Sequence, residues 1–210
     1  MAKKVFGPLS PTPEEILAKM KKLKEVHWYG VRVASQHERK LVDMLKEKLD
    51  KDPTFGVKEA YVPIRQEKHR WSDRIKVVDQ VLTPSLIFIR TSMEHKNDVF
   101  LTRDVKSYVY APGGNKPCPI ADNVMMDFIR IIDANYDFKM TLPLVGEDVM
   151  VLEGPLKGVV GQLVKIDGDH QLIIRLNDAF GASVTMDPLS VSKVPKGTVS
   201  IPAEHVPSKI

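Results

Sequence analysis

The chain has 210 residues, enough for one large or two small domains, and its 43% hydrophobic and 28% charged residues are ordinary for a globular protein. Its net charge of +4 is mild evidence for a polyanionic partner. A single cysteine excludes an internal disulfide and a cysteine-rich zinc site and suits a reducing cytosol, and the longest apolar runs are too short for a membrane-spanning helix.

The first 49 residues predict two amphipathic helices around one strand. Residues 13–26 begin with Pro13 and two acidic residues and continue with lysines, an order that complements the helix dipole, so we expect a short helix in an N-terminal extension of residues 1–25. Residues 27–34, HWYGVRVA, are aromatic and β-branched, which is typical of a buried strand. In residues 37–49 leucines recur at every fourth position, which places them on one face of a helix.

Further strands follow, up to another helix. Apolar and β-branched segments predict strands at residues 57–64, 81–90 and 107–114. Residues 122–132 predict a helix with an acidic first residue, and its apolar face carries Val124, Phe128, Ile131 and Ile132. We therefore expect a first domain of the α+β class over residues 26–134, in which two helices cover one face of a largely antiparallel sheet.

A linker and a set of short strands follow this domain. Residues 135–144 break the pattern and predict a linker, and five short strands in residues 145–194 predict a small five-stranded β-barrel before a tail of residues 195–210. Residues 26–134 hold 18 Lys/Arg and 15 Asp/Glu, a net charge of +3, whereas residues 145–194 hold 4 and 7, a net charge of −3. A nucleic acid is therefore expected to contact the first domain.

Glycines recur in a strand-like segment at the start of the barrel, GEDVMVLEGPLKGVVGQLVKI (146–166). Gly154 and Pro155 predict the turn between two strands, and Gly158 and Gly161 lie where the second strand begins and bends, where a side chain would strain the backbone. A generic hairpin is the alternative interpretation. The whole string resembles the KOW motif, which occurs in ribosomal proteins and in elongation factors of the NusG/Spt5 family, and the resemblance implies an SH3-like barrel.

The segments before the barrel resemble the N-terminal (NGN) domain of the NusG/Spt5 family in the same order, and the resemblance covers residues 26–194. The matching segments are WYGVRV, SQHERKLVDML, EAYVPIR, a basic segment, and PCPIADNVMMDFI. QHERK and HRWSDRIKVV look more like specialised members, such as RfaH and the UpxY regulators of capsular polysaccharide operons, than like housekeeping NusG. Where the family commonly has Phe-Pro-Gly-Tyr, this chain has Thr83-Pro84-Ser85-Leu86.

The resemblance implies a transcription elongation or antitermination factor, specific to particular operons, that binds RNA polymerase through its N-terminal domain and suppresses pausing or termination. Aromatic residues are in excess on the predicted strands, and core packing is the alternative role for each candidate. The polymerase-binding candidates are Tyr29, Leu86, Phe88, Tyr108 and Tyr110.

The basic segment 65–76 holds five Lys/Arg and two acidic residues around one tryptophan and predicts a hairpin. One interpretation is a solvated hairpin. The other is a nucleic-acid-facing hairpin, in which basic side chains contact phosphates and the tryptophan stacks on a base or packs at the root. The resemblance to RfaH implies that this surface, together with the start of the helix at 37–49, faces the displaced non-template DNA strand. The candidates are His37, Arg39, Lys40, Arg65, Lys68, Arg70, Trp71 and Arg74.

The segment NDAFG (177–181) places Phe180 in a turn of the acidic barrel. Two roles stay open, since Phe180 either folds back to plug the end of the barrel or is an exposed anchor for a protein partner. In NusG the corresponding loop engages ribosomal protein S10 or the termination factor Rho, so the resemblance implies one of these partners. The valines and isoleucines of the barrel favour strands, and we expect no RfaH-like refolding into helices.

The sequence does not indicate an enzyme, because it has no nucleophile with a base at motif spacing, no phosphate-binding loop and no metal-ligand cluster. We expect no cofactor and no metal. A ribosome-associated or RNA-binding KOW protein is the alternative function, against which the acidic barrel argues, because an RNA-docked module should be basic. We expect a cytoplasmic monomer without membrane contact.

Overall fold

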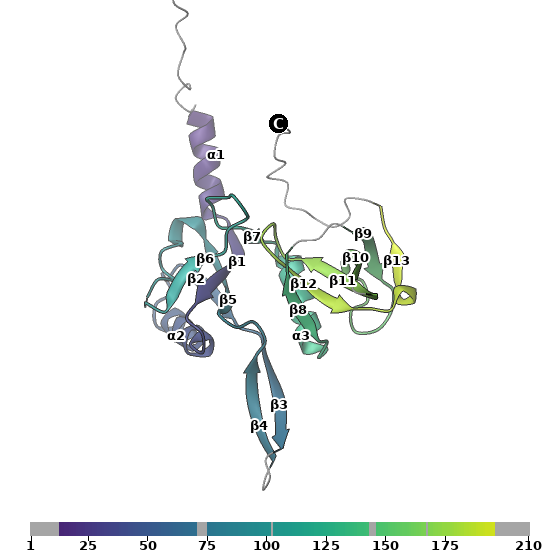
Figure 1. The fold of residues 1–210 in the computed structure, drawn as a ribbon. Coiled ribbons are helices and arrows are strands. Elements are labelled where there is room, and N and C mark those ends of the chain that lie inside the picture. Colours follow the sequence, from purple (N-terminus) through teal and green to yellow (C-terminus); the bar gives the residue numbers. More distant parts are fainter. Residues whose placement is uncertain (1–12, 71–74, 102, 143–145, 167, 196–210) are drawn as a thin grey trace, which may run out of the picture.

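The computed structural model describes residues 13–70, 75–101, 103–142, 146–166 and 168–195, and its fold is α+β (Figure 1). The helices in these residues are α1 (Pro13–Lys24), α2 (Glu38–Lys51) and α3 (Asp122–Asp133), with short 3-10 turns η1 (Met93–His95) and η2 (Pro188–Ser190). The strands of the first domain are β1 (Val26–Val33), β2 (Val57–Tyr61), β3 (Ile64–Arg70), β4 (Ile75–Val81), β5 (Leu86–Ser92), β6 (Val105–Tyr108) and β7 (Pro119–Ile120). The remaining strands are β8 (Phe138–Thr141), β9 (Glu147–Val151), β10 (Val160–Ile166), β11 (Asp169–Arg175), β12 (Gly181–Thr185) and β13 (Val191–Lys193).

An antiparallel sheet with the strand order β2-β5-β1-β6 forms the centre of the first domain, and β7 also pairs with β1. Strands β1 and β5 are its central pair, and Gly30 lies opposite Phe88 in their register. Successive side chains of a strand point to opposite faces, so Tyr29 and Val31 lie on one face of the sheet while Trp28 and Gly30 lie on the other. Apolar residues follow one another on both faces of this central pair, and each face needs a cover.

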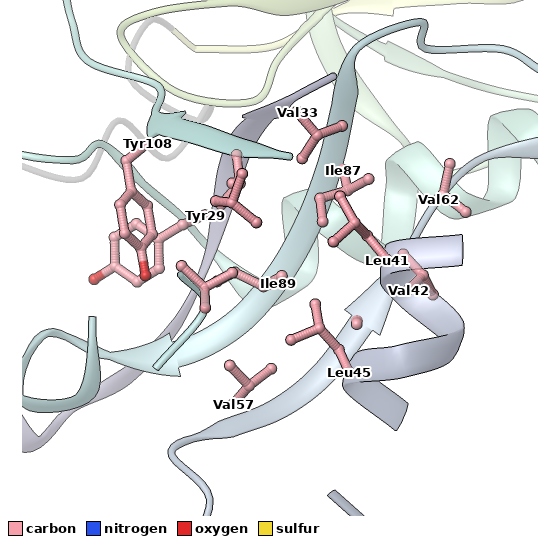
Figure 2. Close-up of a cluster of buried hydrophobic side chains, with 14 of the residues drawn as sticks. Tyr29, Val33, Leu41, Val42, Leu45, Val57, Val62, Ile87, Ile89 and Tyr108 are labelled. Atoms are coloured by element: carbon pink, nitrogen blue, oxygen red, sulfur yellow. The ribbon is translucent and has the colours of Figure 1, made fainter. Parts of the chain in front are cut away.

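Helix α2 covers the face that carries Tyr29 and Val31, which we call the α2 face. Figure 2 shows Leu41, Val42 and Leu45 of α2 directed toward this face of β1 and β5. The predicted stripe of leucines is therefore confirmed as the buried side of the helix. The fully or almost fully buried partners on the strands are Tyr29, Val31, Val33, Val57, Ile87, Ile89 and Tyr108.

Helix α3 lies against the other face, which we call the α3 face, and the expectation that both helices cover one face is wrong. Met125, Phe128 and Ile132 of α3 form one cluster with Trp28 and Phe88. Phe88 and Phe128 are 5.3 Å apart between ring centroids. Because the sheet is apolar on both sides, the two helices have to lie on opposite sides of it.

The basic segment forms the predicted hairpin. Strands β3 and β4 pair with each other from Ile64 opposite Val81 to Arg70 opposite Ile75, as a separate two-stranded sheet. The hairpin projects away from the body of the first domain (Figure 1). The tip, residues 71–74, lies outside the described residues.

The C-terminal domain, which we call the barrel, is a sheet with the order β13-β9-β10-β11-β12-β8. All five predicted strands are present, and a sixth, β8, is added from the predicted linker. Residues 138–141 pair with 181–184 of β12, so this part of the predicted linker is a strand that joins the five predicted ones. The core of the barrel contains Val149, Val151, Leu156, Val159, Leu172, Ile174 and Val184.

The glycines of the KOW-like segment have the roles that their spacing predicts. Gly154 and Gly158 bracket the turn between β9 and β10 and have φ of 75° and 83°, where a side chain is strained. Gly161 lies in β10, where an added Cβ would be 2.8 Å from the carbonyl oxygen of Ile173 on β11. The turn and the close approach between strands therefore both depend on the absence of a side chain.

Helix α1 precedes the first domain and leaves its apolar side chains Leu17, Met20 and Leu23 exposed. Its contacts with the rest of the described structure involve η1. Neither α1 nor any other helix among the described residues is long and apolar enough to cross a membrane.

Candidate partner-binding surfaces

Helix α3 lies between the two domains and contributes to the cores of both. Met125, Phe128 and Ile132 pack on the sheet, whereas Ile131, which is fully buried, packs among the core residues of the barrel. Val124, Phe128, Ile131 and Ile132 were predicted to lie on one apolar face, and the structure divides them between two cores, because apolar residues extend around more of the helix than one face requires. We call this arrangement, in which the barrel contacts α3 and the sheet, the closed arrangement.

Phe180 of the barrel is buried against the α3 face of the first domain. Its ring centroid is 6.2 Å from that of Phe88, and both rings belong to one apolar cluster. Gly30 provides the space, since a Cβ at this position would lie 3.0 Å from Cζ of Phe180 and 3.2 Å from a methyl group of Val109. Phe180 lies in a loop as predicted, but it contacts the other domain instead of plugging its own barrel or facing solvent.

Polar contacts fix the loop that carries Phe180. The side-chain Nδ2 of Asn177 donates to the carbonyl oxygen of Cys118 in the first domain (3.2 Å). The Oδ1 atom of Asn177 accepts from the backbone N–H groups of Ala179 (2.8 Å) and Phe180 (3.2 Å). Both the Nδ2 donor and the Oδ1 acceptor of Asn177 therefore have hydrogen-bond partners. These bonds hold the ring of Phe180 toward the first domain.

Two arginines of the first domain make further polar contacts, one with the KOW-like turn and one with the linker. Nη2 of Arg130 on α3 donates to the carbonyl oxygens of Pro155 (3.1 Å) and Lys157 (2.9 Å) in the KOW-like turn. Arg65 at the root of the hairpin donates to Asp137 (2.7 Å) and to the carbonyl oxygen of Tyr136 (2.6 Å), just before β8. The hairpin, the linker and the barrel are therefore tied to one another in the closed arrangement.

The structure separates the five polymerase-binding candidates into three groups. Tyr29 and Tyr108 pack edge to face in the core of the α2 face, with their ring centroids 5.9 Å apart. This burial favours the alternative interpretation that both residues serve core packing. Burial raises the pKa of Tyr29 to about 12, with a further contribution from Glu25, and burial also raises the pKa of Tyr108. Phe88 lies on the α3 face under Phe180, while Leu86 is half-buried beside it and Tyr110 is exposed.

The nucleic-acid candidates are also divided. Arg65 is engaged with the linker, and its side chain is only 17% exposed, so a contact with phosphate would first have to break the tie described above. Arg39 forms an ion pair with Asp79 of β4, His37 lies 3.0 Å from Asp104, and Lys40 is exposed. Lys68 and Arg70 belong to β3, and Trp71 and Arg74 lie outside the described residues.

A pocket of about 390 Å³ lies between the start of α2 and the strand β4. Its lining includes the carboxyl groups of Glu38, Glu67 and Asp79, which disfavour a phosphate in the pocket itself. Glu38 is buried and its carboxylate accepts the backbone N–H of Ser85 at 2.7 Å, at a residue with φ of 61°. This contact supports the turn in which the chain has serine where the family commonly has glycine. No cluster of His, Cys, Asp or Glu that could hold a metal ion occurs within the part of the chain that the structure describes.

Sequence reasoning missed Gly30, Arg130 and Asn177 as interface residues. Gly30 carried a usable signal, because a glycine in the middle of a buried strand often marks the close approach of another group. Asn177 was recognised only as a turn former, and Arg130 looked like an ordinary cation near the end of a helix. The contacts of all three residues join segments that are far apart in the chain, which no local pattern reveals.

Comparisons with known proteins relate the chain to one family and to several solved structures. Residues 26–129, from β1 into α3, match the family described as NusG, transcription termination factor nusG. Among solved structures, the chain is similar to Thermotoga maritima NusG, from a study of its domain interaction, with 23% identity, coverage of 81% of this chain and 98% of that chain, and a TM-score of 0.46. It is also similar to a chain of the MjSpt4:Spt5 complex in conformation B, with 13% identity, coverage of 80% and 97%, and a TM-score of 0.32. A comparison with curated proteins gave no match.

Proposed function

Since this chain belongs to the NusG/Spt5 family of transcription factors, we propose that it binds RNA polymerase through its first domain and suppresses pausing or termination at particular operons. The observation that carries this proposal is the family match, which spans the sheet, α2 and most of α3. The protein would act in the cytoplasm as a binding factor without catalysis of its own.

The α3 face is the best candidate for the polymerase contact. The α2 face is filled by residues of its own domain, so that surface is not free to bind a partner. On the α3 face, by contrast, Phe88 is covered by Phe180 of the barrel, and Leu86 beside it is half-buried. If the barrel moves away, an apolar surface around Phe88 becomes accessible, as a protein interface requires.

The barrel would recruit a second protein. The net charge of −3 over its residues 145–194 disfavours nucleic acid, and its aromatic loop residue Phe180 has the character of an interface anchor. Ribosomal protein S10 and Rho are the candidates that the family suggests. Since Phe180 is buried in the closed arrangement, recruitment would require the barrel to leave the first domain.

The hairpin would contact the non-template DNA strand through Lys68, Arg70 and the tip residues Trp71 and Arg74. The supporting observation is that the hairpin projects from the body of the domain (Figure 1). The basic residues at the start of α2 would contribute less, since Arg39 and His37 already have acidic neighbours.

Co-elution with purified core RNA polymerase tests the proposal. Leu86→Asp places a charge on the proposed surface, and Leu189→Asp is the matched control on the barrel, where Leu189 is 88% exposed. We expect the native chain and L189D to co-elute with polymerase, and L86D to elute separately with an unchanged melting curve. Equal co-elution of all variants would remove the proposed surface, and co-purification with ribosomes in place of polymerase would favour the RNA-binding alternative.

A further inference from the structure

The turn between β9 and β10 holds a guanidinium group. The carbonyl oxygens of Pro155 and Lys157 both lie within hydrogen-bonding distance of Nη2 of Arg130, at 3.1 and 2.9 Å. They converge because Gly154 and Gly158 on either side of them have positive φ. A guanidinium group offers five N–H donors in a fixed plane, so it can bridge two acceptors and still bond elsewhere, as Arg130 does with Asp127 at 3.2 Å.

A group of buried apolar residues that surrounds Ile131 lies beside this turn, and we call it the seat of Ile131. Ile131, the residue that follows Arg130, is fully buried among Val149, Leu156 and Val159 of the barrel. Met125, Phe128 and Ile132 of α3 pack on the sheet, and their cluster also includes Phe138 and Phe180 of the barrel. Arg130 and Ile131 are the adjacent residues of α3 that contact the turn between β9 and β10 and the core of the barrel.

The contact between Arg130 and the turn can be replaced by another donor, because it is only partly buried. The side chain of Arg130 is 42% exposed, so water and competing groups can reach it. Its acceptors are backbone carbonyl groups, which stay in place when the arginine leaves, because the turn is closed by its own hydrogen bonds from Lys157 to Gly154 and from Gly158 to Val151. The net charge of −3 over residues 145–194 attracts a cation to this part of the molecule.

We propose that the turn 154–158, together with the seat of Ile131, is a docking site for a helix of a protein partner that presents an arginine next to an aliphatic residue. In the closed arrangement α3 of the first domain occupies this site. The inference rests on the proposed function, in which the barrel recruits a protein, and it names the chemistry by which that protein is recognised. Nucleic acid does not fit the site, because carbonyl oxygens and a negative net charge repel phosphates.

The test uses the full chain with α3 displaced and a helix supplied from outside. The titrated protein, which we call the receiver, is the ¹⁵N-labelled double variant Arg130→Ala and Ile131→Asp. It keeps the sheet-facing residues of α3. The probe is a synthetic peptide of residues 121–135, constrained to be helical by a side-chain link on its exposed face, and the matched controls are the same peptide with R130Q and with R130K. Amide shifts of Leu156–Val159 report occupancy of the turn.

We expect the native peptide to shift these amides saturably, and the R130Q peptide to bind about tenfold more weakly, because charge-assisted hydrogen bonds are lost. The R130K peptide should fall between them, since lysine keeps the charge without the planar fork. Equal affinity of the native and R130Q peptides would overturn the guanidinium site, and the absence of saturable shifts would overturn the helix-docking site.

If the double variant does not fold, R130A alone, which keeps the buried Ile131, is titrated with the same peptides and the same outcomes apply. Failure of the proposed function is a separate result. Loss of polymerase co-elution in the native chain would refute the proposed function whatever the peptides do, whereas co-elution together with equal peptide affinities would refute the guanidinium site alone.

Discussion

The two faces of the central sheet are built from alternate residues of the same strands, yet they are covered in different ways. The α2 face is filled by Leu41 and Leu45 of a helix that follows β1 directly in the chain. The α3 face is shared among α3 and two phenylalanines of the barrel, Phe138 of β8 and Phe180, and Phe180 is 150 residues away from Gly30 in the chain. One face is therefore the core of a domain, and the other is partly an interface between domains.

This difference indicates where the molecule can open. Separating the barrel from the first domain leaves the α2 face intact, because no residue of the barrel belongs to its cluster. The same separation uncovers Phe88 and Phe180 together, since each ring covers the other. Stability and partner binding are thus assigned to opposite faces of one sheet, and substitutions on the two faces should have different consequences.

The largest effect is expected on the α2 face. Leu45→Ala should lower the free energy of unfolding of the first domain by about 3 kcal/mol, because a fully buried leucine is lost and a cavity remains. Chemical denaturation of the full chain measures this change. Met126→Ala, at an exposed position of α3, is the control and should change the free energy by less than about 0.5 kcal/mol. A loss below about 1 kcal/mol for L45A would show that the α2 face is not a well-packed core.

A smaller effect of another kind is expected at Phe180. Phe180→Ala should weaken docking of the barrel by about 2 kcal/mol, since the ring leaves an interface and not the interior of either domain. Both domains should stay folded, while the amides of Gly30 and Val109 shift and the rotational correlation times of the two domains decrease. Phe100→Ala, at an exposed aromatic residue of the first domain, is the control. Unfolding of the barrel in F180A would instead mean that Phe180 is a core residue of its own domain.

Gly30→Ala should produce a still smaller effect through the same contact. The new methyl group would lie 3.0 Å from Cζ of Phe180, and this overpacking should weaken docking by about 1 kcal/mol. The two substitutions should not be additive, because F180A removes the ring that the methyl group meets. A double-mutant cycle on the docking equilibrium measures the coupling. Additive effects would indicate that Val109, the other neighbour, is responsible for the strain.

The smallest effect concerns the hairpin and separates two arginines that look alike in the sequence. Arg70→Ala should reduce the slope of log K against log salt for single-stranded DNA by about 0.7, the value for one phosphate contact. Arg65→Ala should leave the slope unchanged, because Arg65 already binds Asp137 and the carbonyl oxygen of Tyr136. Fluorescence anisotropy with a labelled oligonucleotide at several salt concentrations measures both slopes. Equal reductions for the two variants would contradict the assignment of Arg65 to the linker.

Local patterns were sufficient to predict most of the elements. The leucines of α2, the aromatic and β-branched residues of β1 and the glycines around the KOW-like turn each describe a structure that neighbouring residues decide. Strand β8 was missed because FKMT is short and contains a lysine, and its pairing partner β12 lies about forty residues further along the chain. Such non-local pairing is set by the fold and leaves little trace in the segment itself.

The functional surfaces were harder to predict because they depend on which domain contacts which face. Tyr29 and Phe88 are both buried aromatic residues on central strands, and only the structure shows that one packs under α2 and the other under Phe180. Likewise, Arg65 and Arg70 lie on one strand, and only the structure shows that Arg65 reaches the linker. The sequence alone indicated candidate residues and could not assign their partners.

The central claim is that this chain acts on RNA polymerase through the α3 face of its first domain. Single-round transcription by purified core polymerase on a template with one strong pause site measures this action as the lifetime of the paused complex. The account predicts that the native chain shortens the pause, that Leu86→Asp removes the effect, and that Leu189→Asp retains it. An unchanged pause lifetime with the native chain, or an equal effect of the native chain and L86D, would contradict it.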